Sequence, residues 1–176
     1  RKGIWQQDCR GGNHVSCNTY KTCAYDRINL NTIQKRGMNV FNFGKKKNKG
    51  IEVGSPVKGK AVAISNVSDP TFGEEILGKG VAIMPAEGKI YAPADGKIEM
   101  LFDTMHAVSM ITSEGVEILI HIGLDTVALK GEHFTAYKGN GDSVKKGELL
   151  IEADMDAIKG AGYDVITPMV VCNTSD

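Results

Sequence analysis

Two histidines, His106 and His121, are the residues of this chain best suited to chemistry. They lie fifteen residues apart in the segment HAVSMITSEGVEILIHIGLD, which reads as two apolar strands around a Ser-Glu-Gly turn. A neutral imidazole has one nucleophilic and one donor nitrogen, and its pKa of about 6.5 leaves it largely neutral at cellular pH. Two imidazoles on one face can therefore act together on a phosphoryl group. One attacks the phosphorus atom, and the other donates a hydrogen bond to a phosphoryl oxygen.

The elements that must position these histidines are two strands, predicted at 106–112 and 116–122, and the turn between them. A two-residue turn at 113–114 places the histidines directly opposite each other, with Cβ atoms about 5 Å apart. A turn at 114–115 makes them diagonal neighbours on one face. A three-residue loop puts them on opposite faces, because a one-residue slip of register inverts every side chain. Two of the three registers bring the imidazoles together.

Thr104 and Asp125 flank the pair. Thr104 lies two residues before His106 on the same strand face, so its hydroxyl can hold one ring nitrogen and leave the other free. The pattern predicts reversible phosphohistidine chemistry. Zinc at His106 and His121 is the minority alternative, because two histidines supply half of a tetrahedral ligand set and Asp125 can supply a third ligand.

The composition is typical of a globular protein, and the formal net charge is zero. It has 176 residues, 41% of them hydrophobic, and 21 basic residues balance 21 acidic ones. Balanced charge gives no argument for a nucleic acid partner. No apolar run approaches the roughly 20 residues that span a bilayer, and we see no secretory signal, so we expect a cytoplasmic protein. The 21 glycines indicate many tight turns between short strands.

Turns punctuate short apolar runs from about residue 51 onward. Besides the two strands that carry the histidines, strands are predicted at 61–67, 81–85, 97–102 and 148–153. SPVKGKAVAI and APADGKIEML share a Pro-x-x-Gly-Lys core 37 residues apart, which indicates an internal duplication. We predict an all-β fold, a compact antiparallel β-sandwich or barrel built from an internally duplicated motif, with short helical turns.

Three segments of different character divide the chain. Residues 1–37 show neither helical nor strand periodicity, and we expect an unstructured or non-native N-terminal extension, for instance translation upstream of a start codon at Met38. Residues 38–50 form a basic and apolar leader that can adhere weakly to an anionic membrane surface. Residues 51–176 form the expected folded domain.

Four segments carry a resemblance to a known family: DPTFGEEILGKGVAIMP, YAPADGKI, DTMHAVSMITSEGVEILIHIGLDTVALKG and ITPMVV. They closely resemble the glucose-family IIA proteins, EIIA-Glc-like phosphocarriers of the bacterial phosphoenolpyruvate-dependent sugar phosphotransferase system. The resemblance implies a phosphotransferase component in which His121 takes a phosphoryl group from phospho-HPr and passes it to a cysteine of a IIB domain during sugar uptake. It implies that His106 supports this group, that Thr104 holds the far nitrogen of His106, and that the carbonyl of Gly123 does the same for His121.

The resemblance also implies a surface for partners. The acidic rim residues, which would meet a basic residue of HPr, are Asp69 and Asp125, and the apolar docking residues are Phe72, Ile76, Phe102 and Val127. No cofactor is required, and both histidines must lie on one face. Regulated transporters or kinases are further partners to expect, because a phosphoryl charge on an apolar surface weakens the docking of an apolar partner.

Two departures from the family and two rival interpretations remain. The family domain continues past TPMVV into a closing strand that this chain lacks, which would leave a strand edge unpaired, and residues 1–37 have no family counterpart. NGDSVKKGELLIEADMDAI is similar to lipoyl and biotin carriers, but the turn after Glu152 lacks their lysine. The alternative function is a zinc-binding or purely regulatory interaction module that uses the same histidine pair.

Overall fold

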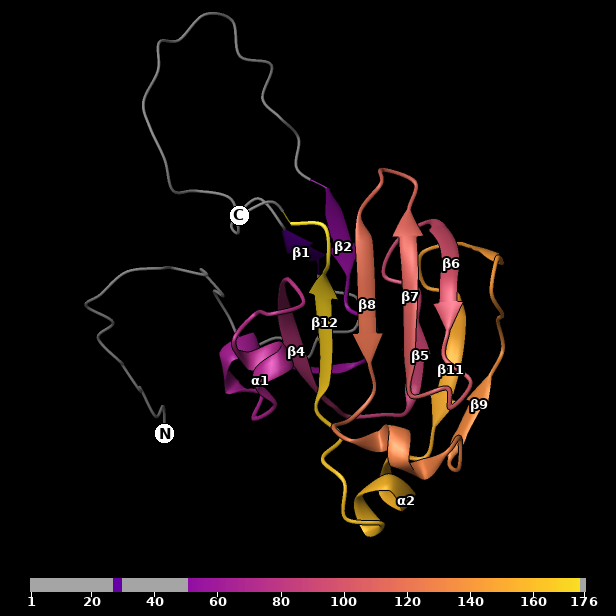
Figure 1. Cartoon of the computed structure of the whole chain (residues 1–176). Coiled ribbons are helices and arrows are strands. Elements are labelled where there is room, and N and C mark those ends of the chain that lie inside the picture. Colours follow the sequence, from indigo (N-terminus) through magenta and orange to yellow (C-terminus); the bar gives the residue numbers. More distant parts are fainter. Residues whose placement is uncertain (1–26, 30–50, 175–176) are drawn as a thin grey trace, which may run out of the picture.

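The computed structural model describes residues 27–29 and 51–174 (Figure 1). The basic leader at 38–50 lies outside the described residues, as does all of the expected extension except 27–29. The predictions about an upstream start and about membrane contact concern those parts and stay predictions.

The described residues form short strands with a few helical segments. The strands are β1 (Arg27–Asn29), β2 (Glu52–Gly54), β3 (Gly59–Ala63), β4 (Lys79–Pro85), β5 (Lys89–Tyr91), β6 (Gly96–Leu101), β7 (Ala107–Thr112), β8 (Glu117–His121), β9 (Phe134–Ala136), β10 (Ser143–Val144), β11 (Leu149–Ala153) and β12 (Thr167–Val171). The helical segments are the 3₁₀ helices η2 (Ile64–Asn66) and η3 (Thr126–Leu129) and the α-helices α1 (Pro70–Gly73) and α2 (Met155–Gly160). The prediction of an all-β fold with short helical turns is confirmed.

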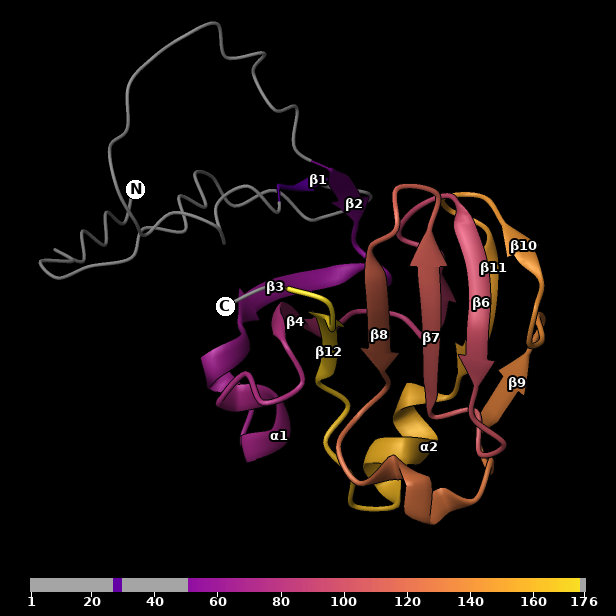
Figure 2. The same cartoon turned by 45° about the horizontal axis from the view of Figure 1, so that its top comes forward.

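Two sheets enclose the main core. The larger sheet has the strand order β10-β6-β7-β8-β12-β4-β3, and the smaller one has the order β5-β11-β9. Every strand pair is antiparallel. β5 and β11 lie behind β6 and β7 in Figure 1, and Figure 2 shows β11 beside β6. The largest fully buried side chains come from both layers and include Ile90, Ile98, Met110, Ile118, Ile120, Leu150 and Ile151.

The two Pro-x-x-Gly-Lys motifs lead into equivalent strands. β3 begins at Gly59 and pairs with β4, and β6 begins at Gly96 and pairs with β7. A Cβ at Gly59 would lie 2.2 Å from the Met84 carbonyl oxygen, and one at Gly96 would lie 2.2 Å from that of Ile111. Both glycines therefore permit the same close approach of two backbones. β3-β4-β12 and β6-β7-β8 take equivalent places in the two halves of the sheet, which agrees with the predicted internal duplication.

We expect Gly59→Ala and Gly96→Ala each to lower the free energy of unfolding by about 1–3 kcal/mol, because the added methyl group must displace a strand backbone. Gly160→Ala is the matched control, since a Cβ there would meet nothing within 4 Å. Urea denaturation measures the three variants. Equal stability of Gly96→Ala and Gly160→Ala would contradict the close approach.

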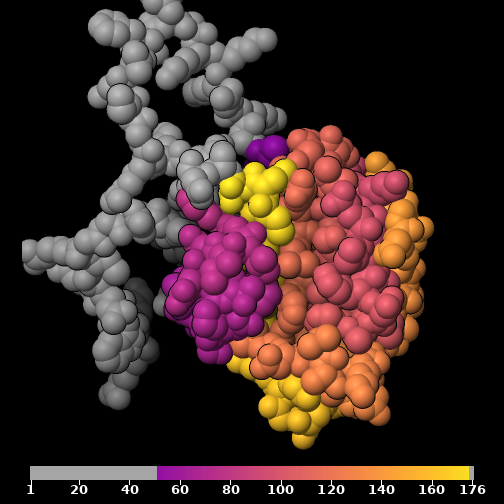
Figure 3. All heavy atoms as spheres, viewed as in Figure 1, coloured from indigo at the N-terminus to yellow at the C-terminus, as the bar shows by residue number. Residues whose placement is uncertain are grey.

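The predicted strand at 61–67 is wrong in its second half. β3 ends at Ala63, and η2 follows because Val67 N donates to the carbonyl of Ile64 at 2.9 Å. Ile64 and Val67 are buried in a smaller core cluster that also contains Phe72 of α1 and Leu124. This cluster fixes α1 beside the end of the large sheet where β8 finishes. In the space-filling view, the magenta segment that contains α1 stands against the yellow and orange strands (Figure 3).

Candidate functional site

The hairpin that carries the histidines has a three-residue loop, 113–115. Ala107 lies opposite His121, and Ile111 lies opposite Glu117. This is the register that was expected to separate the histidines, so the prediction of a register that pairs them is wrong. The two imidazoles nevertheless lie side by side, with ring centroids 4.8 Å apart and ring planes at 82°.

Strand alternation fails at His106 because this residue precedes the strand. The chain turns between Phe102 and His106, where Met105 N donates to the Phe102 carbonyl at 2.7 Å and Met105 has a φ of 53°. A left-handed residue breaks the extended geometry on which alternation depends. The backbone of His106 still joins the end of β8, since Ile122 N donates to its carbonyl at 2.8 Å. The turn therefore brings the His106 ring to the His121 side.

A backbone carbonyl fixes the tautomer of His121. Nδ1 of His121 lies 2.7 Å from the carbonyl oxygen of Gly123. Because a carbonyl oxygen can only accept, Nδ1 carries the hydrogen and Nε2 keeps its lone pair. Gly123 has a φ of 75°, and a Cβ there would lie 2.6 Å from Cγ2 of Thr126. Glycine thus allows the backbone to fold back under the ring.

A hydroxyl group holds His106. Nδ1 of His106 lies 2.5 Å from Oγ1 of Thr104, and His106 is only 6% exposed. A hydroxyl can donate or accept. When Thr104 donates, Nε2 of His106 carries a hydrogen, which complements the lone pair on Nε2 of His121. The pair then offers one nucleophilic nitrogen and one donor nitrogen.

Both imidazoles are neutral at pH 7. Burial, and secondarily the nearby His121, lowers the pKa of His106 to about 4. Burial also lowers the pKa of His121, while the Gly123 carbonyl and the carboxylates of Asp69 and Asp125 oppose that shift. Neutrality matters because only the unprotonated nitrogen is nucleophilic.

We expect acid to destabilise the fold through His106. The unfolded chain keeps a histidine pKa near 6.5, whereas the folded state holds that of His106 near 4, so the unfolded state binds more protons between these values. Stability is therefore fully present above pH 6.5 and falls by up to about 3 kcal/mol as the pH drops toward 4. Urea denaturation at several pH values measures how the free energy of unfolding changes with pH. His106→Gln should remove most of this pH dependence. An unchanged pH dependence in that variant would contradict the assignment to His106.

The acidic rim residues Asp69 and Asp125 both act on His121. Asp69 caps α1, its carboxylate accepting a hydrogen bond from Thr71 N at 2.8 Å. Asp125 is exposed, has a φ of 58° and directly precedes η3. Both carboxylates raise the pKa of His121, so both act on its ring electrostatically.

The apolar docking residues fall into two groups. Ile76 is 67% exposed, Val127 52% and Phe102 37%. Phe72 instead is 4% exposed, with its ring centroid 5.1 Å from that of His121. Phe72 therefore packs against His121 and offers little area to a partner in this structure, in contrast to the open position that the resemblance implied.

The described part of the chain provides no complete metal site. Among residues 27–29 and 51–174, no group of three or more His, Cys, Asp or Glu side chains is arranged to hold a metal ion. In this structure Asp125 does not complete a three-residue ligand set with His106 and His121. Because both Nδ1 atoms are hydrogen-bonded, His106 and His121 could offer a metal only their Nε2 atoms.

Comparison with known proteins identifies the family. Residues 51–176 match the family described as phosphoenolpyruvate-dependent sugar phosphotransferase system, EIIA 1. The chain belongs to this family. It is 45% identical over 136 residues to the PTS system glucose-specific EIIA component of Haemophilus influenzae, a match that covers 76% of this chain and 82% of that protein. The resemblance to glucose-family IIA proteins is thus confirmed, and the EIIA domain is a phosphotransferase component.

Two further relatives place the EIIA domain in context. The PTS system beta-glucoside-specific EIIBCA component of Bacillus subtilis is 48% identical over 120 residues, which cover 68% of this chain and 20% of that protein. The chain thus spans about a fifth of the length of such multi-component relatives. The solved structure of glucose permease IIA from Mycoplasma capricolum superposes with a TM-score of 0.70 at 35% identity, covering 73% of this chain and 83% of that one. This similarity confirms the β-sandwich.

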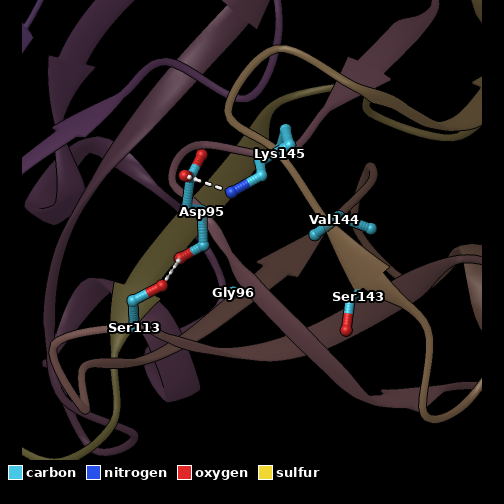
Figure 4. A pocket seen from close by; sticks show the side chains of 6 residues that line it. All are labelled: Asp95, Gly96, Ser113, Ser143, Val144 and Lys145. Atoms are coloured by element: carbon cyan, nitrogen blue, oxygen red, sulfur yellow. Dashed lines mark hydrogen bonds and ion pairs between the residues drawn. The ribbon is translucent and has the colours of Figure 1, made fainter.

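The opposite end of the large sheet holds a shallow pocket of about 240 Å³ (Figure 4). Its lining residues are Asp95, Gly96, Ser113, Ser143, Val144 and Lys145. Lys145 Nζ lies 3.0 Å from Oδ2 of Asp95, and Ser113 Oγ donates to the Asp95 carbonyl at 3.4 Å. Asp95 is thus already bonded to both Lys145 and Ser113. We assign the pocket no function. No helix in the described part of the EIIA domain is long and apolar enough to cross a membrane.

Sequence reasoning missed two residues that support Gly123. Thr126 Oγ1 donates to the Ile122 carbonyl at 2.6 Å, and Leu124 N donates to the Asp164 carbonyl at 2.9 Å. A threonine after a loop glycine carries no pattern of its own. Asp164 reaches the loop only through folding, from the segment that follows α2.

Proposed function

We propose that this EIIA domain carries a phosphoryl group on Nε2 of His121, taken from phospho-HPr and passed to a cysteine of a IIB domain during sugar uptake. The observation that carries the proposal is the hydrogen bond from Nδ1 of His121 to the Gly123 carbonyl. It leaves Nε2 as the nucleophilic atom of a neutral imidazole. Membership of the EIIA family supports the same chemistry.

The transfer needs no cofactor. The Nε2 lone pair of His121 attacks phosphorus, the new N–P bond forms, and the bond to the donor atom breaks with its electron pair returning to the donor. The ring then carries a positive charge, which the Gly123 carbonyl stabilises through the Nδ1 hydrogen. A hydrogen on Nε2 of His106 bonds to a phosphoryl oxygen. In the onward step a thiolate attacks, the N–P bond breaks, and its electron pair returns to Nε2.

The surroundings of the pair support docking of protein partners. Ile76, Phe102 and Val127 expose apolar side chains, while Asp69 and Asp125 add negative charge beside His121. A partner with an apolar face and a basic residue fits this surface, which agrees with HPr and IIB as partners. A phosphoryl group on His121 would add negative charge there, so the same surface can regulate transporters or kinases according to phosphorylation. We place this activity in the cytoplasm.

The deciding experiment transfers label from phosphoenolpyruvate through the two general phosphotransferase proteins to the purified domain. Peptide mapping under conditions that preserve acid-labile phosphate then locates the label. We expect it on His121. Label on neither histidine would reject phosphohistidine chemistry and leave the purely regulatory module.

Zinc at the Nε2 atoms of His106 and His121 is the second candidate, with the remaining ligands supplied from outside the domain. Metal analysis of the purified domain tests it. Tightly held stoichiometric zinc would count against a simple phosphocarrier.

A further inference from the structure

We propose that Thr126 is a positioning residue that sets the tautomer of His121 by holding the backbone of the Gly123 loop. The inference rests on the proposed function only for its consequence in phosphoryl transfer, because the tautomer itself exists without any partner. Thr126 lies at the start of η3 and is fully buried at 0% exposure. It touches no reacting atom, and it acts through Gly123.

The peptide unit that joins Gly123 to Leu124 is held from both sides. Its carbonyl oxygen accepts the hydrogen of Nδ1 of His121 at 2.7 Å, and its N–H, on Leu124, donates to the Asp164 carbonyl at 2.9 Å. In a planar trans peptide, the C=O and N–H bonds point in opposite directions. Anchoring the N–H to Asp164 therefore aims the carbonyl at the His121 ring.

Thr126 holds the preceding peptide unit. Its hydroxyl donates to the Ile122 carbonyl at 2.6 Å, which fixes the plane between Ile122 and Gly123. Its methyl group, Cγ2, occupies the place that a Cβ on Gly123 would need, at 2.6 Å from that position. The methyl group therefore leaves no room for a side chain at position 123, and the hydroxyl bond holds the peptide next to Gly123, whose φ is 75°.

Loss of this hydroxyl has a defined consequence. Without it, the Ile122 carbonyl has lost its hydroxyl donor inside the core, and the peptide plane can rotate to find another one. Rotation turns the neighbouring Gly123 carbonyl away from Nδ1 of His121. The ring is then free to place its hydrogen on Nε2, and this tautomer has no lone pair on the nitrogen that faces the phosphoryl group.

The test compares Thr126→Val, which keeps the shape but removes the hydroxyl, with Thr126→Ser, which keeps the hydroxyl. Nitrogen-15 NMR of the imidazole reports which ring nitrogen of His121 carries the hydrogen. We expect Nδ1–H in the parent and in Thr126→Ser, and a detectable share of Nε2–H in Thr126→Val. The rate of label acceptance by Thr126→Val should fall on the order of tenfold.

Thr112→Val is the matched control. Thr112 is also buried, its Oγ1 accepts a hydrogen bond from Val116 N at 3.1 Å, and it lies at the other end of β7. We expect Thr112→Val to lose stability without a change in the His121 tautomer. A tautomer change in the control equal to that in Thr126→Val would overturn the proposal, because general loosening would then explain both.

Three further outcomes also support or overturn the positioning role of Thr126. A folded Thr126→Val domain with the parent tautomer overturns the proposal. If Thr126→Val does not fold, Thr126→Ser decides alone, since Nε2–H in that variant would show that the hydroxyl does not set the tautomer. If the tautomer responds as expected but His121 accepts no label, the positioning role stands and the proposed function fails.

Discussion

His121→Ala should accept at least about 1,000-fold less phosphoryl label than the parent domain, because the variant lacks the attacking atom itself. His106 cannot replace His121. His106 keeps its Nδ1 on Thr104 and is 6% exposed, so it approaches the phosphoryl group only beside His121. The measurement is the initial rate of label transfer from phospho-HPr to equal amounts of the two domains.

His133→Asn is the control for this prediction. His133 is exposed and has a φ of 72°, a conformation that asparagine also adopts. The His133→Asn domain should accept label at the same rate as the parent domain. Far-ultraviolet circular dichroism of His121→Ala guards against loss of fold, which we do not expect because Phe72 and the Gly123 loop retain their other contacts. Label acceptance by a folded His121→Ala domain at more than a few per cent of the parent rate would reject His121 as the carrier.

The histidine hairpin illustrates what local patterns can predict. Alternation located β7 and β8 to within a residue, and the repeated Pro-x-x-Gly-Lys core predicted the duplication. The predicted register was wrong because the loop at 113–115 has three residues, and the rings still meet because Met105 breaks the extended geometry just before His106. Met105 adopts a left-handed conformation without being glycine or asparagine, and no local preference indicates that. The rings meet through a turn, where the strand pattern would have separated them.

Long-range contacts set the other limit on prediction. The family resemblance implied that Phe72 is a docking residue, but Phe72 is buried in a core cluster with Ile64, Val67 and Leu124. The hydrogen bond from Leu124 N to the Asp164 carbonyl joins residues that are 40 positions apart, and it depends on the course of the chain after α2. Such contacts arise from packing of the two sheets and their loops, and single-sequence periodicity contains no record of them.

His106→Gln should accept label to nearly the parent end point yet pass it to IIB on the order of 100-fold more slowly. The two measurements differ because labelling with excess phospho-HPr is an equilibrium, whereas transfer to IIB is a rate. A dianionic phosphoryl group favours the protonated form of a neighbouring imidazole, so His106 can take a positive charge as the phosphoryl group moves. Glutamine can donate a hydrogen bond from a similar place but cannot take that charge, and charged donors bind more strongly.

His106→Ala, which removes the donor altogether, should transfer more slowly than His106→Gln. Single-turnover transfer from the prelabelled domain to an isolated IIB domain measures both variants against the parent. The pH dependence separates charge from simple hydrogen bonding. If His106 acts as an imidazolium, parent transfer should slow as rising pH removes its proton, while His106→Gln should show no such decline. Parallel profiles for the two domains would assign His106 the role of a neutral donor and contradict the charge argument.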